Sequence, residues 1–348
     1  MELSTVWFIL IAVLWTGYFV LEGFDFGVGM LLPILSRSSD PKEADRRRRV
    51  MLTTIGPVWD GNEVWVLTAG GATFAAFPHW YATLFSGFYL PLLLILVALI
   101  VRNLGFEYRG KRDSDAWRAG WDKAIIVGSF VPALLWGVAF ANIVNGVPLA
   151  PAPGNAAPYV EFTGNLFTLL GPLGLLGGLT TLGLFLTHGA MYIALKTVGD
   201  IRHDAEAFAW KSGLVTAVLA IAFLVWTNVN TGSPASWVLS ILAAVALVAA
   251  LAANRIGRDG FAFAGTFATI ALAVWALFAA LFPDVMPSSI DPAYSLTAAN
   301  AASSQLTLQI MTVAALVFTP VVLAYQGWTY WVFRRRIGTQ HIPVAAPH

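Results

Sequence analysis

Nine apolar segments, each about long enough to cross a lipid bilayer, follow one another along this 348-residue chain. A transmembrane helix needs about 20 mostly apolar residues. Only 11% of the residues are charged, against roughly 25% in soluble domains. The sequence therefore predicts an all-α integral membrane protein, formed as a single polytopic domain over 1–348. We expect its spans at about 5–35, 51–77, 80–101, 122–145, 164–195, 212–230, 236–253, 261–282 and 305–333.

The basic residues predict how these spans are oriented. All 20 Lys and Arg residues fall in the first, third, fifth and seventh connections, at the span ends beside them, or in the C-terminal tail, and the other connections have none. Because loops on the cytoplasmic side are the ones enriched in Lys and Arg, we expect the N-terminus outside and the C-terminus inside. A net charge of only +1 offers no basic surface for a nucleic acid, so membrane lipid is the expected surrounding.

Four acidic residues lie well inside the predicted spans, all of them in the first two: Glu22, Asp25, Asp60 and Glu63. A carboxylate in the middle of a membrane costs about 2.5–3.5 kcal/mol on the insertion scale, so it usually faces protein or water. Asp25 and Asp60 each lie about ten residues, roughly 15 Å, from the predicted inner surface. Within each helix the two acids are three residues apart and share a face. The pattern predicts a four-carboxylate cluster that opens toward the cytoplasm.

Two interpretations of this cluster are open. It could serve proton uptake or proton coupling, because neighbouring carboxylates raise one another's pKa and exchange protons readily. It could instead be an inert polar network between helices or subunits. Arg102, at the inner end of the third span, is the nearest candidate counter-ion. For Arg102 alone, a snorkelling interface anchor is an equal alternative.

Two tryptophans and one histidine also have unusual positions. Trp59 and Trp65 lie at mid-depth, whereas tryptophans normally gather at membrane interfaces, so we expect them to line a site or a subunit contact. His188 is the only histidine within a predicted span, and such a residue is more often a hydrogen-bonded packing residue than a metal ligand. The chain has no cysteine, which excludes thiolate metal sites. We therefore expect no metal or haem ligands in this chain.

Several motifs run in order from the first span to the last: GFDFGVG at 23–29, WDGNEVW at 59–65, SGFY at 86–89, RNLGFEYR at 102–109, GSFVP at 128–132, MPSS at 286–289 and SSQLTL at 303–308. This set resembles subunit II of the cytochrome bd-type quinol oxidases, and the resemblance covers essentially the whole chain.

The resemblance implies a haem-free subunit of a heterodimer in the bacterial cytoplasmic membrane. Subunit I would carry two b-type haems, haem d and the quinol-oxidising loop, and the complex would couple quinol oxidation to the reduction of O2 to water. The family fold has two four-helix bundles plus one peripheral helix. Some relatives bind a quinone structurally in this subunit, to which we assign no residue here. A small single-span accessory subunit is a further partner that the sequence leaves open.

The resemblance also implies roles for individual residues. Asp25 and Asp60 match acids of a proton path from the cytoplasm to the oxygen-reducing haem, and Arg102 matches a basic residue near it. Glu22 and Glu63 join the path only by their predicted depth, and some relatives have Gln at the position of Glu63. Trp65 matches the lateral entrance for oxygen, and we place Trp59 with it on the strength of its depth.

The leading hypothesis is therefore an accessory subunit that supports assembly of the haem-bearing subunit, proton delivery and oxygen access. The alternative is a stand-alone proton-coupled secondary transporter that uses the same acids. Transporters, however, often have discontinuous helices at corresponding positions of two halves, whereas here all four acids lie in one hairpin. A structural scaffold with inert acids is the third hypothesis.

Overall fold

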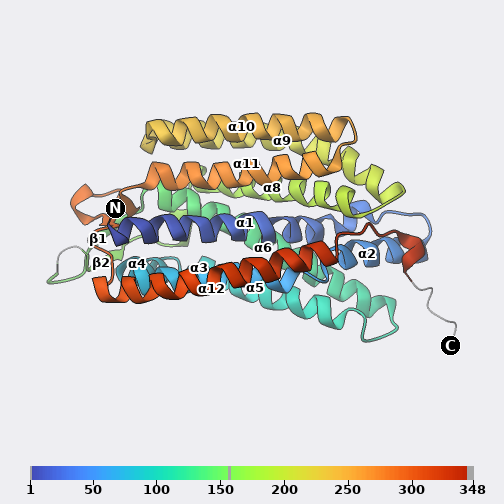
Figure 1. The fold of residues 1–348 in the computed structure, drawn as a ribbon, viewed down its shortest axis with the longest axis horizontal. Helices are drawn as coiled ribbons and strands as arrows, with labels where there is room; N and C mark the ends of the chain where they lie inside the picture. The colour runs from blue at the N-terminus through green and yellow to red at the C-terminus, as the bar shows by residue number, and fades with distance from the viewer. Residues whose placement is uncertain (1, 156–157, 343–348) are drawn as a thin grey trace.

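The computed structural model describes residues 2–155 and 158–342, and its long helices run nearly parallel to one axis (Figure 1). The helices with more than 20 residues are α1 (Leu3–Leu35), α6 (Asp115–Asn145), α8 (Pro172–Lys196), α9 (Asp200–Thr231), α10 (Pro234–Arg255), α11 (Asp259–Leu281) and α12 (Gln305–Val332). The shorter ones are α2 (Pro41–Ile55), α3 (Trp59–Ala76), α4 (Pro78–Gly87), α5 (Tyr89–Tyr108) and α7 (Leu166–Leu169).

Two small antiparallel hairpins lie at the end of the molecule where α1 begins (Figure 1). In the first hairpin Leu149 is opposite Phe162, and in the second Asp284 is opposite Thr297. Their strands are β1 (Leu149–Pro151), β2 (Val160–Phe162), β3 (Asp284–Met286) and β4 (Leu296–Thr297), and two 3-10 turns, η1 (Pro292–Tyr294) and η2 (Thr339–His341), complete the elements.

Eight helices within the described residues are long and apolar enough to cross a membrane: α1, α5, α6, α8, α9, α10, α11 and α12. The predicted class, an all-α protein with many membrane spans, is thereby confirmed. α3 has 18 residues and carries two carboxylates in its first two turns. It occupies the second predicted span, so the count of nine spans and their orientation stay predictions.

The second predicted span, 51–77, is wrong as one continuous helix. α2 ends at Ile55 and α3 begins at Trp59, because Pro57 has no backbone N–H to continue the helical hydrogen bonds. Asp60 therefore lies in the first turn of α3 and not about ten residues into a helix. The estimate that placed Asp60 level with Asp25 does not apply to this backbone.

The third predicted span, 80–101, is divided in the same way. α4 ends at Gly87 and α5 begins at Tyr89, with Pro91 in the first turn of α5, where its missing N–H costs no hydrogen bond within the helix. α5 and α6 both extend further than predicted toward their connecting loop. Residues 109–118 and α2 consequently lie at the same end of the molecule, which we call the basic end (Figure 1).

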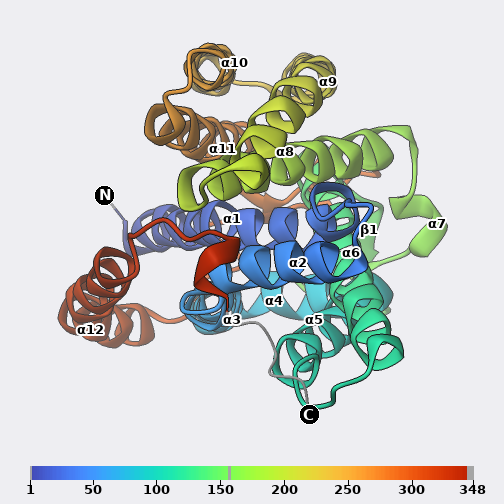
Figure 2. The same ribbon diagram turned by 90° about the vertical axis from the view of Figure 1, so that its right-hand side faces the viewer.

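α1 is the central helix of the fold. Seen end-on, α8 to α11 lie on one side of α1 and α3 to α5 on the other, while α12 lies at the edge (Figure 2). Aromatic rings of α1 pack into α6: the Trp15 ring centroid is 4.8 Å from that of Trp136 and 4.9 Å from that of Phe140. Phe19 is 5.0 Å from Phe140. Because these rings are buried, α1 is fixed in position by the core.

Glycines let α1 and α8 touch backbone to backbone. A Cβ atom added at Gly27 would lie 2.8 Å from the Cα atom of Gly189 and would also meet the carbonyl oxygen of Phe185. Small residues permit this close approach of helices in membranes. The crossing lies two residues after Asp25, so it fixes the height of the acidic face of α1 within the bundle.

Candidate functional site

Three acids and one arginine, from three helices, meet inside the bundle. Glu22 on α1 and Arg102 on α5 form an ion pair, and both side chains are fully buried. Arg102 Nη1 is also 3.7 Å from Glu63 Oε2 on α3. Asp25, one turn along α1 from Glu22, is fully buried as well. The structure thus brings together four of the five residues that the sequence predicts for a proton path.

Two phenylalanine rings flank the Arg102 guanidinium. Its Cζ atom is 4.8 Å from the Phe26 ring centroid and 5.0 Å from that of Phe106. A buried charge is costly unless it is paired, and Arg102 is paired with Glu22. The counter-ion interpretation of Arg102 is therefore confirmed, and the interface-anchor interpretation is wrong.

The carboxylate of Glu63 is held by the residue after Arg102. Asn103 Nδ2 lies 2.9 Å from each oxygen of Glu63 and donates to them. The Glu63 side chain remains 17% exposed, unlike those of Glu22 and Arg102. Glu63 therefore lies between the buried ion pair and the surface.

Asp25 is bound by an amide and not by the arginine. Asn62 Nδ2 on α3 donates to Asp25 Oδ2 at 2.7 Å, and Asn62 is fully buried. Among the described residues, Asp25 Oδ1, Glu22 Oε2, and Nε and Nη2 of Arg102 have no hydrogen-bond partner. Buried polar atoms in native proteins nearly always have a protein or water partner. The cluster therefore has unused capacity for hydrogen bonds at its centre.

Asp60 does not join the buried group. It is exposed and lines a groove of about 900 Å³ between α1, α3 and α12. Asn62, Trp65, Gln326 and Tyr330 line the same groove. The predicted four-carboxylate cluster is therefore three buried or half-buried acids, with the fourth in an adjoining groove.

The two tryptophans of the second motif have different environments. Trp65 lines the groove, and its Nε1 donates to Gln326 Oε1 on α12 at 2.9 Å. Trp59 instead packs against Phe106, with 5.1 Å between the ring centroids. Only Trp65 thus has its indole N–H bound by α12.

His188 is a packing residue, as the sequence predicts. Its Nδ1 is 2.7 Å from Thr266 Oγ1 and its Nε2 is 3.1 Å from the carbonyl oxygen of Val20. The imidazole also stacks on Phe263, with 4.6 Å between centroids. Because both ring nitrogens are engaged, His188 does not fit an axial haem ligand. Within 2–155 and 158–342, no group of three His, Cys, Asp or Glu residues could hold a metal ion.

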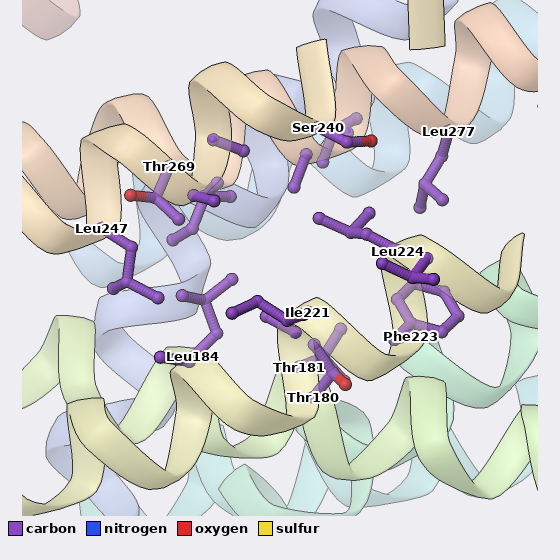
Figure 3. Close-up of a pocket in the computed structure, with 18 of the residues that line it drawn as sticks. Thr180, Thr181, Leu184, Ile221, Phe223, Leu224, Ser240, Leu247, Thr269 and Leu277 are labelled. Carbon is purple, nitrogen blue, oxygen red and sulfur yellow. The ribbon is translucent and has the colours of Figure 1, made fainter. Parts of the chain in front are cut away.

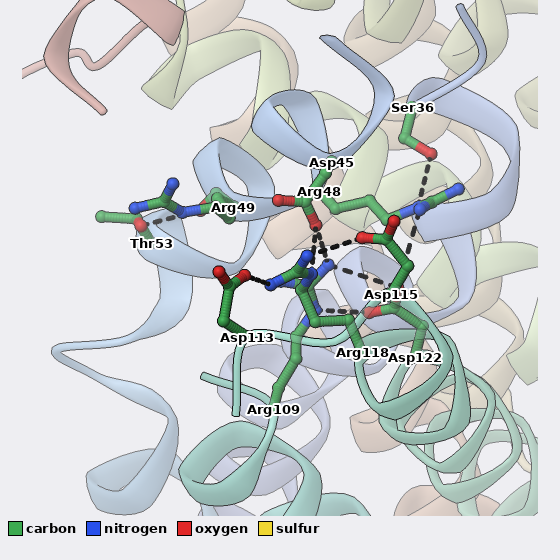
Figure 4. Close-up of polar contacts among 10 residues, drawn as sticks. All are labelled: Ser36, Asp45, Arg48, Arg49, Thr53, Arg109, Asp113, Asp115, Arg118 and Asp122. Atoms are coloured by element: carbon green, nitrogen blue, oxygen red, sulfur yellow. Dashed lines mark hydrogen bonds and ion pairs between the residues drawn. The ribbon is translucent and has the colours of Figure 1, made fainter. Parts of the chain in front are cut away.

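A network of ion pairs lies at the basic end (Figure 4). Arg109, just after α5, binds Asp122 of α6 at 2.6 Å and Asp45 of α2 at 2.7 Å. Burial lowers the pKa of the Arg109 guanidinium, but its bonds to these two aspartates outweigh that effect and raise the pKa above its ordinary value. Arg48 of α2 is 3.7 Å from Asp122. The network ties α2 to the adjoining ends of α6 and of α5, the helix that carries Arg102.

A second, apolar cavity of about 270 Å³ lies among α8 to α11 (Figure 3). Hydroxyl groups line parts of it, but they already donate to backbone carbonyls: Thr180 to Leu176, Thr269 to Gly265 and Ser240 to Ser236. The cavity therefore offers no strong hydrogen-bonding group, and its chemistry suits only apolar occupants.

Sequence reasoning missed two amides that bind the acids, Asn62 and Asn103, and two residues of α12 that bind Asn62, namely Gln326 and Tyr330. Asn62 lies within the WDGNEVW motif, between the two carboxylates of Asp60 and Glu63. Gln326 and Tyr330 are four residues apart and share one face of an otherwise apolar helix. That spacing is a signal that could have identified a polar site on α12.

Comparisons with known proteins assign the chain to a family. The family model described as "Cytochrome bd terminal oxidase subunit II" matches residues 3–333. The chain is 41% identical to "Cytochrome bd ubiquinol oxidase subunit 2" of Bacillus subtilis, over 97% of each protein. It is 38% identical to "Cytochrome bd-I ubiquinol oxidase subunit 2" of Escherichia coli, over 98% of this chain and 96% of the relative.

A solved structure has the same fold. It is titled "The structure of bd oxidase from Geobacillus thermodenitrificans" and has a TM-score of 0.76 at 15% identity, over 96% of this chain and 99% of the solved chain. Together with the family match, this confirms the resemblance that the motifs indicate. The chain therefore belongs to the cytochrome bd terminal oxidase subunit II family.

Proposed function

We propose that this chain delivers protons from the cytoplasmic side to the haem-bearing subunit of a quinol oxidase. The chain is one subunit of that oxidase and a multi-pass protein of a bacterial respiratory membrane. Its complex would couple quinol oxidation to the reduction of O2 to water, and subunit I is the implied partner. The proton path would enter at Asp60 and pass through the buried cluster.

One observation carries this proposal: three acids lie close together inside an apolar bundle that places a single arginine beside them. Glu22, Asp25 and Glu63 could carry three negative charges against the one positive charge of Arg102. Three ionised carboxylates around one guanidinium would leave uncompensated charge in a medium of low dielectric. The cluster is therefore suited to hold a proton and to pass it among its carboxyl oxygens.

The groove supplies the way in. Asp60 is exposed on the groove wall, while Asn62, two residues along α3, donates to buried Asp25. Asp60 and Glu63 are three residues apart on α3 and share one face, so a proton taken up by Asp60 can pass to Glu63. Glu63 is half-buried, and its Oε2 is 3.7 Å from Arg102 Nη1. The positive charge of Arg102 would stabilise the ionised form of Glu22 or Glu63 between proton transfers.

The orientation inferred from the sequence supports this direction. The basic end contains α2, the loop after α5 and the segment 333–342 after α12 (Figure 1). Because basic segments face the cytoplasm in membrane proteins, we infer that Asp60, at the α2–α3 break, faces that side. We further propose nine spans, with α3 as the second, arranged as two four-helix bundles with α12 at the periphery.

Further proposed roles concern oxygen entry, the location of the haems and assembly. Trp65 lines the groove beside α12 and is a candidate for controlling the entry of oxygen. The haems would reside in subunit I, because His188 has both nitrogens engaged. Support for assembly of subunit I, a quinone bound to this chain and an accessory single-span subunit stay predictions.

Two observations argue against the alternatives, a stand-alone transporter and an inert scaffold. Membership of a family of oxidase subunits removes the basis for a stand-alone secondary transporter. An inert scaffold would not need three acids beside one arginine in an apolar bundle, since uncompensated buried charge costs free energy.

Asp25→Asn in the complete complex tests the proton role. Asparagine keeps the size of the side chain but cannot carry the proton, so we expect quinol oxidase turnover to fall at least tenfold with the haem absorption spectrum unchanged. Asp113→Asn, at an exposed aspartate of the basic end, is the matched control. Full turnover in Asp25→Asn would refute the proton role, and loss of the haems would indicate a structural one.

A further inference from the structure

A chain of hydrogen bonds runs from Trp65 through α12 to Asp25. Trp65 Nε1 donates to Gln326 Oε1 at 2.9 Å. Gln326 Nε2 donates to Asn62 Oδ1 at 3.3 Å, and Asn62 Nδ2 donates to Asp25 Oδ2 at 2.7 Å. Tyr330, one turn after Gln326, donates its hydroxyl proton to the same Asn62 oxygen at 2.7 Å. α12 thus reaches the buried acid through a single amide.

The chemistry of its two ends fixes the direction of this chain. An indole N–H can only donate, so it must meet the oxygen of the Gln326 amide. The nitrogen of Gln326 is then left to donate to the oxygen of Asn62, and the nitrogen of Asn62 must face Asp25. The Tyr330 hydroxyl adds a second donor to Asn62 Oδ1. Each amide is thereby held in one of its two orientations.

We propose that α12 is a positioning element for Asp25, in which Gln326 and Tyr330 hold the Asn62 amide so that its N–H stabilises the ionised carboxylate. A hydrogen bond donated to a carboxylate favours the charged form. Asn62 Nδ2 also lies 3.5 Å from the carbonyl oxygen of Leu21, a longer contact than the two from α12. Without the two α12 contacts the amide is held less firmly, and an amide that turns its oxygen toward Asp25 favours the protonated acid. The physiological meaning of this control rests on the proposed proton path.

Other groups around Asp25 do not replace the amide. Within the described residues, the titratable or charged groups that face it come from five helices: Glu22 on α1, Glu63 on α3, Arg102 on α5, Tyr192 on α8 and Tyr330 on α12. Arg102 is paired with Glu22, and the Tyr192 hydroxyl donates to the carbonyl oxygen of Thr54 at 3.0 Å. Asn62 is therefore the neighbour whose orientation can change the charge of Asp25 while the ion pair stays intact.

The packing of α12 makes this control separable from stability. Leu308 is the one α12 residue that is buried, and it lies at the end remote from Asn62. Removing a hydroxyl from Tyr330 therefore leaves the hydrophobic core intact. A loss of function in such a variant can be assigned to the hydrogen bond.

Infrared titration of the complete oxidase complex tests the proposal directly. The carboxyl C=O band that is absent in Asp25→Asn identifies protonated Asp25. In Tyr330→Phe we expect this band to persist to a pH about one unit higher than in the wild type, because a tenfold change in proton affinity corresponds to one unit. Tyr325→Phe makes the same chemical change at an exposed position of α12 and is the control.

Gln326→Leu is the second variant, in case Tyr330→Phe fails to assemble. It should also move the pH midpoint at which the band disappears to a higher pH. An unchanged midpoint in an assembled variant of either residue would overturn the proposal. The readout needs no turnover, so the two proposals fail separately. If the pH midpoint moves in the α12 variants while Asp25→Asn keeps full turnover, the role of α12 is supported and the proton path is refuted.

Discussion

Arg102 on α5 and Glu22 on α1 form an ion pair in which neither side chain is exposed. The pair links α5 to α1 inside the bundle, and each side chain compensates the charge of the other. Removing one partner of a buried pair leaves an uncompensated charge and typically costs about 3–5 kcal/mol.

Arg102→Gln should therefore destabilise the complex more than any change at the surface. We expect a lower yield of assembled oxidase and a lower midpoint of thermal unfolding. The double variant Glu22→Gln/Arg102→Gln should recover part of the loss, because contacting residues are coupled. Arg112→Gln, at an exposed arginine, should have no effect. Equal losses in the single and double variants would contradict a stabilising pair.

Asp60→Asn should slow turnover without disturbing the haem spectrum. The side chain is exposed in the groove, so its replacement has little cost in packing, yet the first proton acceptor of the proposed path is lost. Glu63→Gln should have the smaller effect, since Asn103 and Arg102 can still bind an amide oxygen there. Steady-state oxygen consumption with excess quinol measures both. Wild-type rates in Asp60→Asn would exclude this entrance.

Trp65 should influence two properties that different substitutions separate. Trp65→Phe removes the indole N–H that binds Gln326 but leaves most of the ring volume in place. We expect it to raise the pH midpoint at which the Asp25 carboxyl band disappears and to leave the apparent oxygen affinity unchanged. Trp65→Ala also widens the groove and should change the oxygen affinity. If neither substitution changes that affinity, Trp65 has no part in oxygen entry.

The contact between α1 and α8 should tolerate no side chain. Gly27→Ala places a methyl group against the backbone of Gly189, and neither backbone can move aside, so overpacking should cost about 1–3 kcal/mol. Gly120→Ala, at a helical glycine whose added Cβ would meet no atom within 4 Å, should be neutral or stabilise by up to about 1 kcal/mol. Thermal unfolding of the purified complexes provides the comparison. Equal behaviour of the two variants would argue against the close crossing.

The sequence predicted the membrane class and most of the buried cluster. Charged residues inside apolar segments are rare and expensive, so Glu22, Asp25 and Arg102 could be identified one at a time. The break after α2 was missed, although Pro57 was a visible signal for it. That break moved Asp60 into the groove, because the depth of a residue depends on where its helix begins.

The contacts of Asn62 could not be predicted in the same way. Amides and phenols occur throughout membrane helices, and their hydrogen bonds depend on which helices become neighbours. Gln326 lies 264 positions after Asn62 in the chain, and no local pattern relates the two. The hydrogen-bonded chain exists only because α1, α3 and α12 become neighbours in the fold.

The loose packing of α12 also affects how the protein is made. Ribosomes synthesise α12 after α1 to α11. Its contacts include a bond from Trp7 Nε1 to the Leu308 carbonyl, polar contacts near Asn62, and the segment after α12, where Arg336 binds Asp259. Helices α1 to α11 can therefore complete their core before α12 leaves the translocon. Truncation before α12 should yield an inserted protein in which Asn62 lacks both of its contacts from α12, so a helix synthesised after α1 to α11 completes the environment of an acid on α1.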